Sequence, residues 1–241
     1  MVENHPDIRK QECRGIACLV LSAFCFALMS MFVHLAGDLP SMQKSFFRNL
    51  VAALSAVVLL LRAGEPFRIR RENLPYFLMR SIFGTMGVLC NFYAVDHLVL
   101  ADASILNKMS PFFTVLFSWL ILKEKVMPIQ LSLIFGAFLG SIFVVKPTFS
   151  NLALVPSLLG FFGGICAGAA YTMVRKLGEA GEKGPVIVLF FSVFSCVVVL
   201  PWLIFDYHPM TWQQMGILLL AGCAAAGGQF AITAAYRYAP A

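Results

Sequence analysis

The segment Pro185–Phe205, PVIVLFFSVFSCVVVLPWLIF, contains no charged residue. As a helix it is long enough to cross the ~30 Å hydrocarbon core of a bilayer. Comparable apolar runs recur along the 241 residues, of which 60% are hydrophobic and only 12% are charged. Soluble domains carry about 25% charged residues, so the sequence predicts an integral membrane protein.

Segments with the length and hydrophobicity of a transmembrane helix follow one another along the whole chain. They are Gly15–Leu35, Met42–Leu61, Tyr76–Val95, Leu98–Leu122, Met127–Val145, Leu154–Val174, Pro185–Phe205 and Trp212–Ala235. Each is expected to be helical, because an unpaired backbone amide in lipid costs several kcal/mol and a helix pairs its own amides. The predicted fold class is therefore all-α, with about eight transmembrane helices.

The basic residues predict the orientation of these helices. Most of the 18 lysines and arginines lie on one side, in the N-terminal segment and in the connections that follow even-numbered spans, such as the one from Arg62 to Arg71. Only Lys44 and Lys146 lie on the other side. By the positive-inside rule we expect a cytoplasmic N-terminus in an inner or plasma membrane. The net charge of +6 forms no basic face with aromatics, which argues against a nucleic-acid partner.

A weak internal repeat links the two halves of the sequence. Small and apolar positions of the first span coincide with those of the sixth: Ala27, Met31 and Leu35 with Ala169, Met173 and Leu177. If one unit has five helices, the second begins on the opposite side and is inverted, as in many secondary transporters. We therefore expect a cytoplasmic segment 1–14, a first five-helix repeat 15–145, and an incomplete three-helix second repeat 154–241. Two further helices, roughly 45–60 residues, are expected beyond residue 241.

Three cations lie inside predicted spans, where an ionisable group costs at least about 2.5–3.5 kcal/mol. Arg48 and Arg80 are near enough to a membrane surface to snorkel, so that alternative to a cavity-facing role stays open. Lys108 lies too deep for snorkelling, and we favour a cavity-facing role over a structural pairing with Asp102 or another carboxylate. Pro111 is expected to kink this helix and free carbonyl groups near Lys108, a feature of solute sites in transporters.

Further polar groups within the spans complete the predicted substrate-binding set, with interhelical hydrogen bonding as the alternative for each. They are Asn91, Tyr93, Asn107, Tyr171 and Gln229. The glycine clusters at Gly160, Gly163–Gly164 and Gly227–Gly228 are interpreted as close helix packing rather than phosphate loops. The seven cysteines have no metal-ligand spacing, and no catalytic motif occurs. We expect neither catalytic residues nor a metal or cofactor.

Several stretches resemble the EamA-type drug/metabolite transporter superfamily. The run from Ala101 through Pro111 to Trp119–Lys125 is similar to its fourth helix, and Phe46–Arg48 and Arg80–Gly84 resemble its second and third. Gly227–Ala235 resembles its eighth helix, particularly in the branch related to solute-carrier family 35 G members. The resemblance implies two inverted five-helix repeats, alternating access, and a central cavity involving Arg48, Arg80, Asn91, Lys108, Tyr171 and Gln229.

The expected function is transport of a small metabolite across the bilayer, without enzymatic chemistry. The resemblance implies solutes such as amino acids, nucleotide-derived metabolites, vitamins or drugs. Since cations outnumber acids inside the spans, we expect a solute with a carboxylate or phosphate, anionic or zwitterionic. A non-transporting scaffold or sensor is the alternative. An intramembrane lipid-modifying enzyme would need clustered His, Asp or Glu, which the sequence lacks. The oligomeric state stays open, with a homodimer as one candidate.

Overall fold

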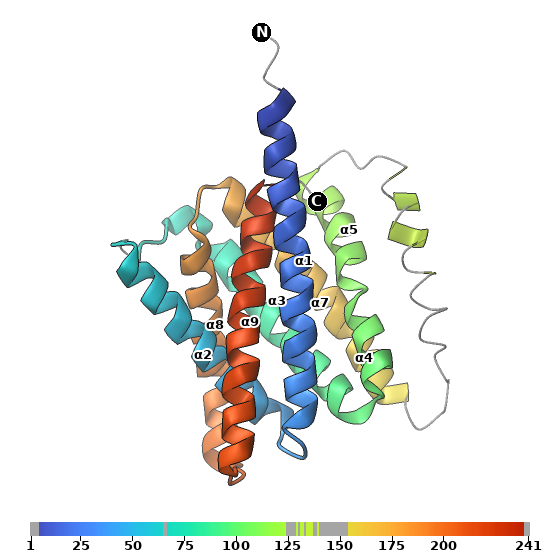
Figure 1. Cartoon of the computed structure of the whole chain (residues 1–241), viewed down its shortest axis with the longest axis vertical. Helices are drawn as coiled ribbons and strands as arrows, with labels where there is room; N and C mark the ends of the chain where they lie inside the picture. Colours follow the sequence, from blue (N-terminus) through green and yellow to red (C-terminus); the bar gives the residue numbers. More distant parts are fainter. Residues whose placement is uncertain are drawn as a thin grey trace.

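The computed structural model describes residues 5–64, 67–123 and 154–238, together with scattered positions between 129 and 139. Its regular elements are helices: α1 (His5–Leu35), α2 (Ser41–Arg62), the 3-10 helix η1 (Arg71–Asn73), α3 (Leu74–His97), α4 (Leu100–Asn107), α5 (Ser110–Leu122), α7 (Leu154–Glu179), α8 (Gly184–Phe205) and α9 (Trp212–Tyr238). They run roughly alongside one another as a bundle (Figure 1). The predicted all-α fold class is confirmed.

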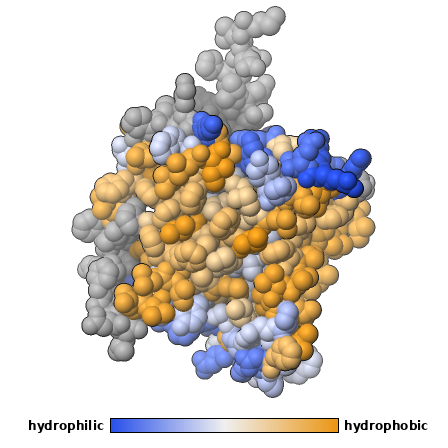
Figure 2. Space-filling view, turned by 180° about the vertical axis from the view of Figure 1, so that it is seen from behind, coloured by the Kyte–Doolittle hydropathy of each residue, from blue (hydrophilic) through white to orange (hydrophobic). Residues whose placement is uncertain are grey.

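Among the described residues, seven segments are long and apolar enough to cross a membrane, with α4 and α5 counted as the single segment Leu100–Leu122. They correspond to seven of the expected spans. Most of the other expected span, Met127–Val145, lies outside the described residues. Figure 2 shows a broad hydrophobic band across the bundle, with hydrophilic side chains gathered at its two ends. The protein is therefore a multi-pass membrane protein.

The closest helix pairs join segments far apart in the sequence. Helix α1 packs along α9, α3 along α7, and α2 along α8, and Figure 1 shows α9 running beside α1. Glycines permit the close approach: a Cβ atom at Gly87 would lie 3.2 Å from the backbone nitrogen of Ala167, and one at Gly228 would lie 2.9 Å from the Phe26 ring. The structure thus places the predicted glycine clusters at helix–helix contacts.

Prolines and glycines mark the helix boundaries. Helix α2 begins directly after Pro40, and α8 has a proline in its first turn, where the missing N–H is not needed. The turns before these two helices contain Gly37 at φ 69° and Gly181 at φ 79°, a left-handed conformation that favours glycine. The turns therefore follow from local sequence.

The fourth expected span is interrupted. Helix α4 ends at Asn107, and α5 begins at Ser110. Pro111 cannot donate to the Asn107 carbonyl and its ring clashes with that group, so the helix breaks upstream of the proline. Across the break, α7 comes very close: a Cβ at Gly164 would lie 2.6 Å from the Leu106 carbonyl oxygen. The disturbance expected from Pro111 is thus a short turn at Lys108 and Met109, whose backbone angles stay in the right-handed helical region.

Candidate functional site

A cavity of about 650 Å³ lies at the centre of the bundle, lined by α1, α3, α4, α5, α7 and α9 and by single residues of α2 and α8. All but one of the predicted site residues line it: Arg48, Arg80, Asn91, Asn107, Lys108, Pro111, Tyr171 and Gln229. The structure thus brings together side chains that hydropathy could only assign to separate spans.

Two buried arginines form the most polar part of the cavity wall. Arg48 on α2 is 1% exposed and Arg80 on α3 is 2% exposed. Both guanidinium groups lie over the ring of Phe191 from α8, with their central carbons 5.8 Å and 4.1 Å from the ring centroid. Such cation–π contacts contribute about 2 kcal/mol when desolvated. The two positively charged guanidinium groups therefore both lie beside the Phe191 ring.

The hydrogen-bond partners of these arginines are neutral. Arg80 Nη2 donates to the Gln229 Oε1 atom at 2.9 Å, and Arg48 Nη1 donates to the Asn49 Oδ1 atom at 2.9 Å. Among the described residues that line the cavity, none is an aspartate or a glutamate. Buried charges in proteins are ordinarily paired with an opposite charge. The cavity wall therefore carries positive charge that the described lining does not compensate.

Lys108 supplies a third cation from the break between α4 and α5. It is exposed and lies in the cavity lining with Asn107 and Pro111. Within the described part of the chain it forms no ion pair with Asp102. The break thus places a flexible cation on the wall built by α4 and α5.

Aromatic side chains line a further part of the cavity. The rings of Tyr171 and Tyr236, from α7 and α9, lie with their centroids 6.0 Å apart. Thr172 and Thr114 hydrogen-bond to carbonyl groups of α5 and α7, with Thr172 Oγ1 donating to the Thr114 carbonyl at 3.3 Å. Helices α5 and α7 are therefore held together beside the cavity.

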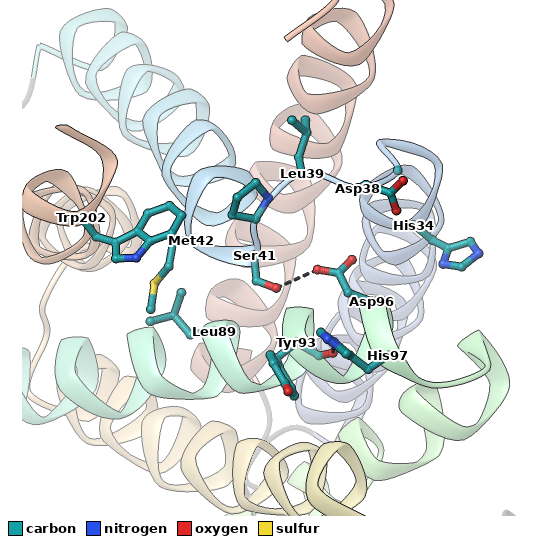
Figure 3. Close-up of a pocket in the computed structure, with 12 residues that line it drawn as sticks. His34, Asp38, Leu39, Ser41, Met42, Leu89, Tyr93, Asp96, His97 and Trp202 are labelled. Atoms are coloured by element: carbon teal, nitrogen blue, oxygen red, sulfur yellow. Dashed lines mark hydrogen bonds between the residues drawn. The ribbon is translucent and has the colours of Figure 1, made fainter. Parts of the chain in front are cut away.

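Tyr93 is the predicted site residue that lies elsewhere. Its ring stacks on His97 with centroids 4.0 Å apart, and both line a second pocket of about 660 Å³ at the end of the bundle where α2 begins and α3 ends. Figure 3 shows the two side chains together, with Ser41 directed at the Asp96 carboxylate. Tyr93 faces away from the central cavity because that cavity is lined by the opposite face of α3.

An ion pair beside this second pocket joins α2 to α3. Lys44 Nζ donates to Asp96 Oδ1 at 2.5 Å, and Ser41 Oγ donates to Asp96 Oδ2 at 2.7 Å. Lys44 is buried, with 1% of its side chain exposed, although it lies at the very start of the predicted span Met42–Leu61. Neither residue is among the predicted site residues, and no short-range motif links them.

Phe191 is the other important residue absent from the predicted set. It lies in a continuous apolar helix, where one more phenylalanine carries no distinguishing signal. Among the described residues, no group of three or more His, Cys, Asp or Glu is arranged to hold a metal ion. The cations and aromatic rings of the central cavity are suited to binding a polar solute.

The sequence pattern of the EamA-like transporter family matches residues 13–146, more than half of the chain. The chain belongs to the EamA-like transporter family. The resemblance to the drug/metabolite transporter superfamily is thereby confirmed.

Two relatives of this EamA-like protein are named for transport. The pseudopaline exporter CntI of Pseudomonas aeruginosa is 33% identical over 226 residues, which cover 93% of this chain and 78% of the exporter. Human solute carrier family 35 member G1 is 27% identical over 203 residues, which cover 80% of this chain and 56% of the carrier. A crystal structure shares the fold, with a TM-score of 0.73 and 13% identity over 94% of this chain and 78% of the other. The EamA-like protein is a membrane transporter.

Proposed function

We propose that this transporter carries a small anionic metabolite, which binds in the central cavity with Arg48 and Arg80 as its anion-binding groups. The observation that carries the proposal is the pair of buried guanidinium groups on a cavity whose described lining contains no acidic residue. A charge buried without a counter-charge is costly, and a carboxylate or phosphate entering the cavity would offset that cost. Arginine forms short bidentate hydrogen bonds with both groups.

Lys108 is proposed as a second point of attachment. It lies on the cavity wall formed by the α4–α5 break, where its long side chain can follow a solute. Asn91, Asn107, Tyr171 and Gln229 supply neutral hydrogen-bonding groups in the same cavity. Specific polar groups in a largely apolar cavity are the usual means by which small-molecule sites orient a ligand.

We further propose alternating access between two inverted repeats, residues 15–145 and the part of the chain from residue 154 onward. The helix pairing supports this proposal. Exchanging the two repeats exchanges α1 with α7 and α3 with α9, so the pair α1–α9 becomes the pair α7–α3, and both pairs are close. The pair α2–α8 maps onto itself, and it is also close. In secondary transporters with such a two-fold relation, the solute site lies at the repeat interface.

The proposed orientation has the N-terminus in the cytoplasm of a cell with an inner or plasma membrane. Its support is the cluster of Arg68, Arg70 and Arg71 in the connection between α2 and α3, on the same side as the start of α1. Positively charged connections of this length remain in the cytoplasm.

Uptake by proteoliposomes tests the proposed function. Replacing Arg80 or Arg48 by alanine removes a charged hydrogen-bond donor worth about 1.5–3 kcal/mol, so we expect uptake of a labelled anionic solute to fall about tenfold or more. Arg68→Ala, an exposed residue outside the cavity, is the matched control and should leave uptake unchanged. Equal uptake by all three variants and the wild type would refute the proposed role, and no flux of any solute in a metabolite panel would favour a scaffold or sensor.

Gly84 offers a second test through the position of Arg80. A Cβ atom at residue 84 would overlap Arg80 Nη1 and lie 2.8 Å from Phe191 Cε2. Gly84→Ala is therefore expected to push the guanidinium away from Phe191 and to lower anion uptake about tenfold, the loss of a desolvated cation–π contact. Gly216→Ala, with no neighbouring atom within 4 Å of its new Cβ, is the control. Unchanged uptake by Gly84→Ala would show that the position of Arg80 over Phe191 is unimportant.

A further inference from the structure

Each cavity arginine is held by a side-chain amide where a carboxylate of similar shape could have stood. Gln229 Oε1 accepts from Arg80 and Asn49 Oδ1 accepts from Arg48, both at 2.9 Å. Glutamate and aspartate would present an oxygen at the same places but would also neutralise the guanidinium. An amide fixes the geometry of the donor and leaves its charge intact. Both positive charges therefore remain for a solute.

The orientation of the Asn49 amide is itself fixed by its surroundings. Its Nδ2 atom donates to the Ser45 carbonyl at 2.9 Å and to Ser195 Oγ at 2.8 Å. Because the nitrogen end of the amide is occupied by these acceptors, the oxygen end faces Arg48. Ser195 belongs to α8, so the same helix that carries Phe191 also sets the Arg48 position.

The guanidinium groups keep unused hydrogen-bonding capacity. The Nε atoms of Arg48 and Arg80 are buried and have no acceptor among the residues that the structure describes. Buried donors in proteins are nearly always hydrogen-bonded, and each guanidinium has five N–H groups in a planar fork. Each guanidinium group therefore has free donors and an uncompensated charge, and it is suited to donating hydrogen bonds to one carboxylate or phosphate group.

The two groups are close enough to act on one solute. Both central carbons lie near the same ring centroid, at 5.8 Å and 4.1 Å, so they are no more than about 10 Å apart, within one Debye length even in water. A solute with one anionic group would leave one buried charge uncompensated. A solute with two anionic groups on a short chain would satisfy both.

We propose that Arg48 and Arg80 act as a pair that selects solutes carrying two anionic groups, and that Asn49 and Gln229 are positioning residues that keep both charges open. This inference rests on the proposed anion transport. It predicts that a carboxylate placed at either amide position lowers the preference for a dianion, because the new side chain pairs with one arginine and leaves a site for a single anionic group.

Binding of two matched probes to the full chain in lipid nanodiscs tests this inference. Glutarate carries two carboxylates, and valerate carries one on a chain of the same carbon number. By calorimetry we expect the wild type to bind glutarate about tenfold or more tightly than valerate, as for one additional charged contact. Gln229→Glu should weaken glutarate binding about tenfold while changing valerate binding little, so that the preference disappears.

Gln229→Met removes the amide oxygen without adding charge and is the matched control. It should retain a clear preference for glutarate. If Gln229→Met lost this preference as Gln229→Glu does, the loss would come from removing the amide and not from the added charge. Asn49→Asp should repeat the effect of Gln229→Glu through Arg48. An unchanged preference in both carboxylate variants would overturn the inference.

The same titrations separate this inference from the proposed function. If the wild type bound glutarate and valerate equally, and Arg80→Ala bound neither, dianion selection would be refuted. The proposed binding of anions in the central cavity would be retained. Absence of any binding of either anion to the wild type would refute both. A glutarate preference that requires both arginines and is lost when a carboxylate replaces either amide supports both.

Discussion

Replacing Asp96 by alanine is expected to destabilise the folded protein by about 3 kcal/mol, because it leaves Lys44 buried without its counter-charge. Only 1% of the Lys44 side chain is exposed, and its amine contacts the Asp96 carboxylate. The substitution also removes the acceptor of the Ser41 hydroxyl. A lower unfolding midpoint in detergent, followed by tryptophan fluorescence, would measure the loss.

Two variants separate this effect from a general sensitivity of the fold. Glu179→Ala removes the carboxylate of the more exposed Arg175–Glu179 pair, and such a pair contributes only about 0.5 kcal/mol. Lys44→Met combined with Asp96→Ala removes both charges and should recover much of the stability lost in Asp96→Ala. If Asp96→Ala unfolded at the same midpoint as Glu179→Ala, the Lys44–Asp96 pair would contribute no more than the partly exposed Arg175–Glu179 pair.

Gly168→Val is expected to destabilise the contact of α7 with α5 by about 3 kcal/mol, the upper part of the range for overpacking. A Cβ atom at residue 168 would lie 2.5 Å from Phe113 Cβ and 2.9 Å from the Thr114 backbone nitrogen. Neither neighbour is a flexible side-chain end, so the helices themselves would have to separate. Thermal unfolding and limited proteolysis between α5 and α7 would both report the change.

Gly216→Val is the matched control for this substitution. Residue 216 is helical in α9, and no atom lies within 4 Å of a Cβ built there. Valine has a higher intrinsic helix propensity than glycine, so the midpoint of this variant should not fall. A similar loss of stability in the two variants would assign the effect to valine in a helix rather than to the packing of α7.

The transmembrane helices were predictable because lipid imposes one length and one secondary structure on an apolar segment. The position of the helix disturbance also followed from Pro111, which was expected to free carbonyl groups near Lys108. The clash of the Pro111 ring falls on the Asn107 carbonyl, and α4 ends at Asn107. Hydropathy contains no information on helix partners, and the pairing of α1 with α9 emerges only in the folded structure.

Candidate site residues were predictable where a polar group stood out against lipid. Arg48, Arg80 and Lys108 were conspicuous for this reason, and the structure places all three on one cavity. Phe191 was not predictable, since its role comes from the two arginines above its ring and not from its own sequence neighbours. Tyr93 illustrates the opposite case, because a polar residue within a span can face either side of its helix.

The pairing of distant helices has a consequence for how the protein is made. Synthesis proceeds from the N-terminus, so α1 enters the membrane first, yet its main partner is α9. Helices α2 and α3 likewise enter the membrane before their partners α8 and α7. Until those partners arrive, the buried polar side chains of α2 and α3, Arg48 and Arg80 among them, lack the surfaces that enclose them. The described part of the bundle therefore cannot assemble before α9 has been inserted.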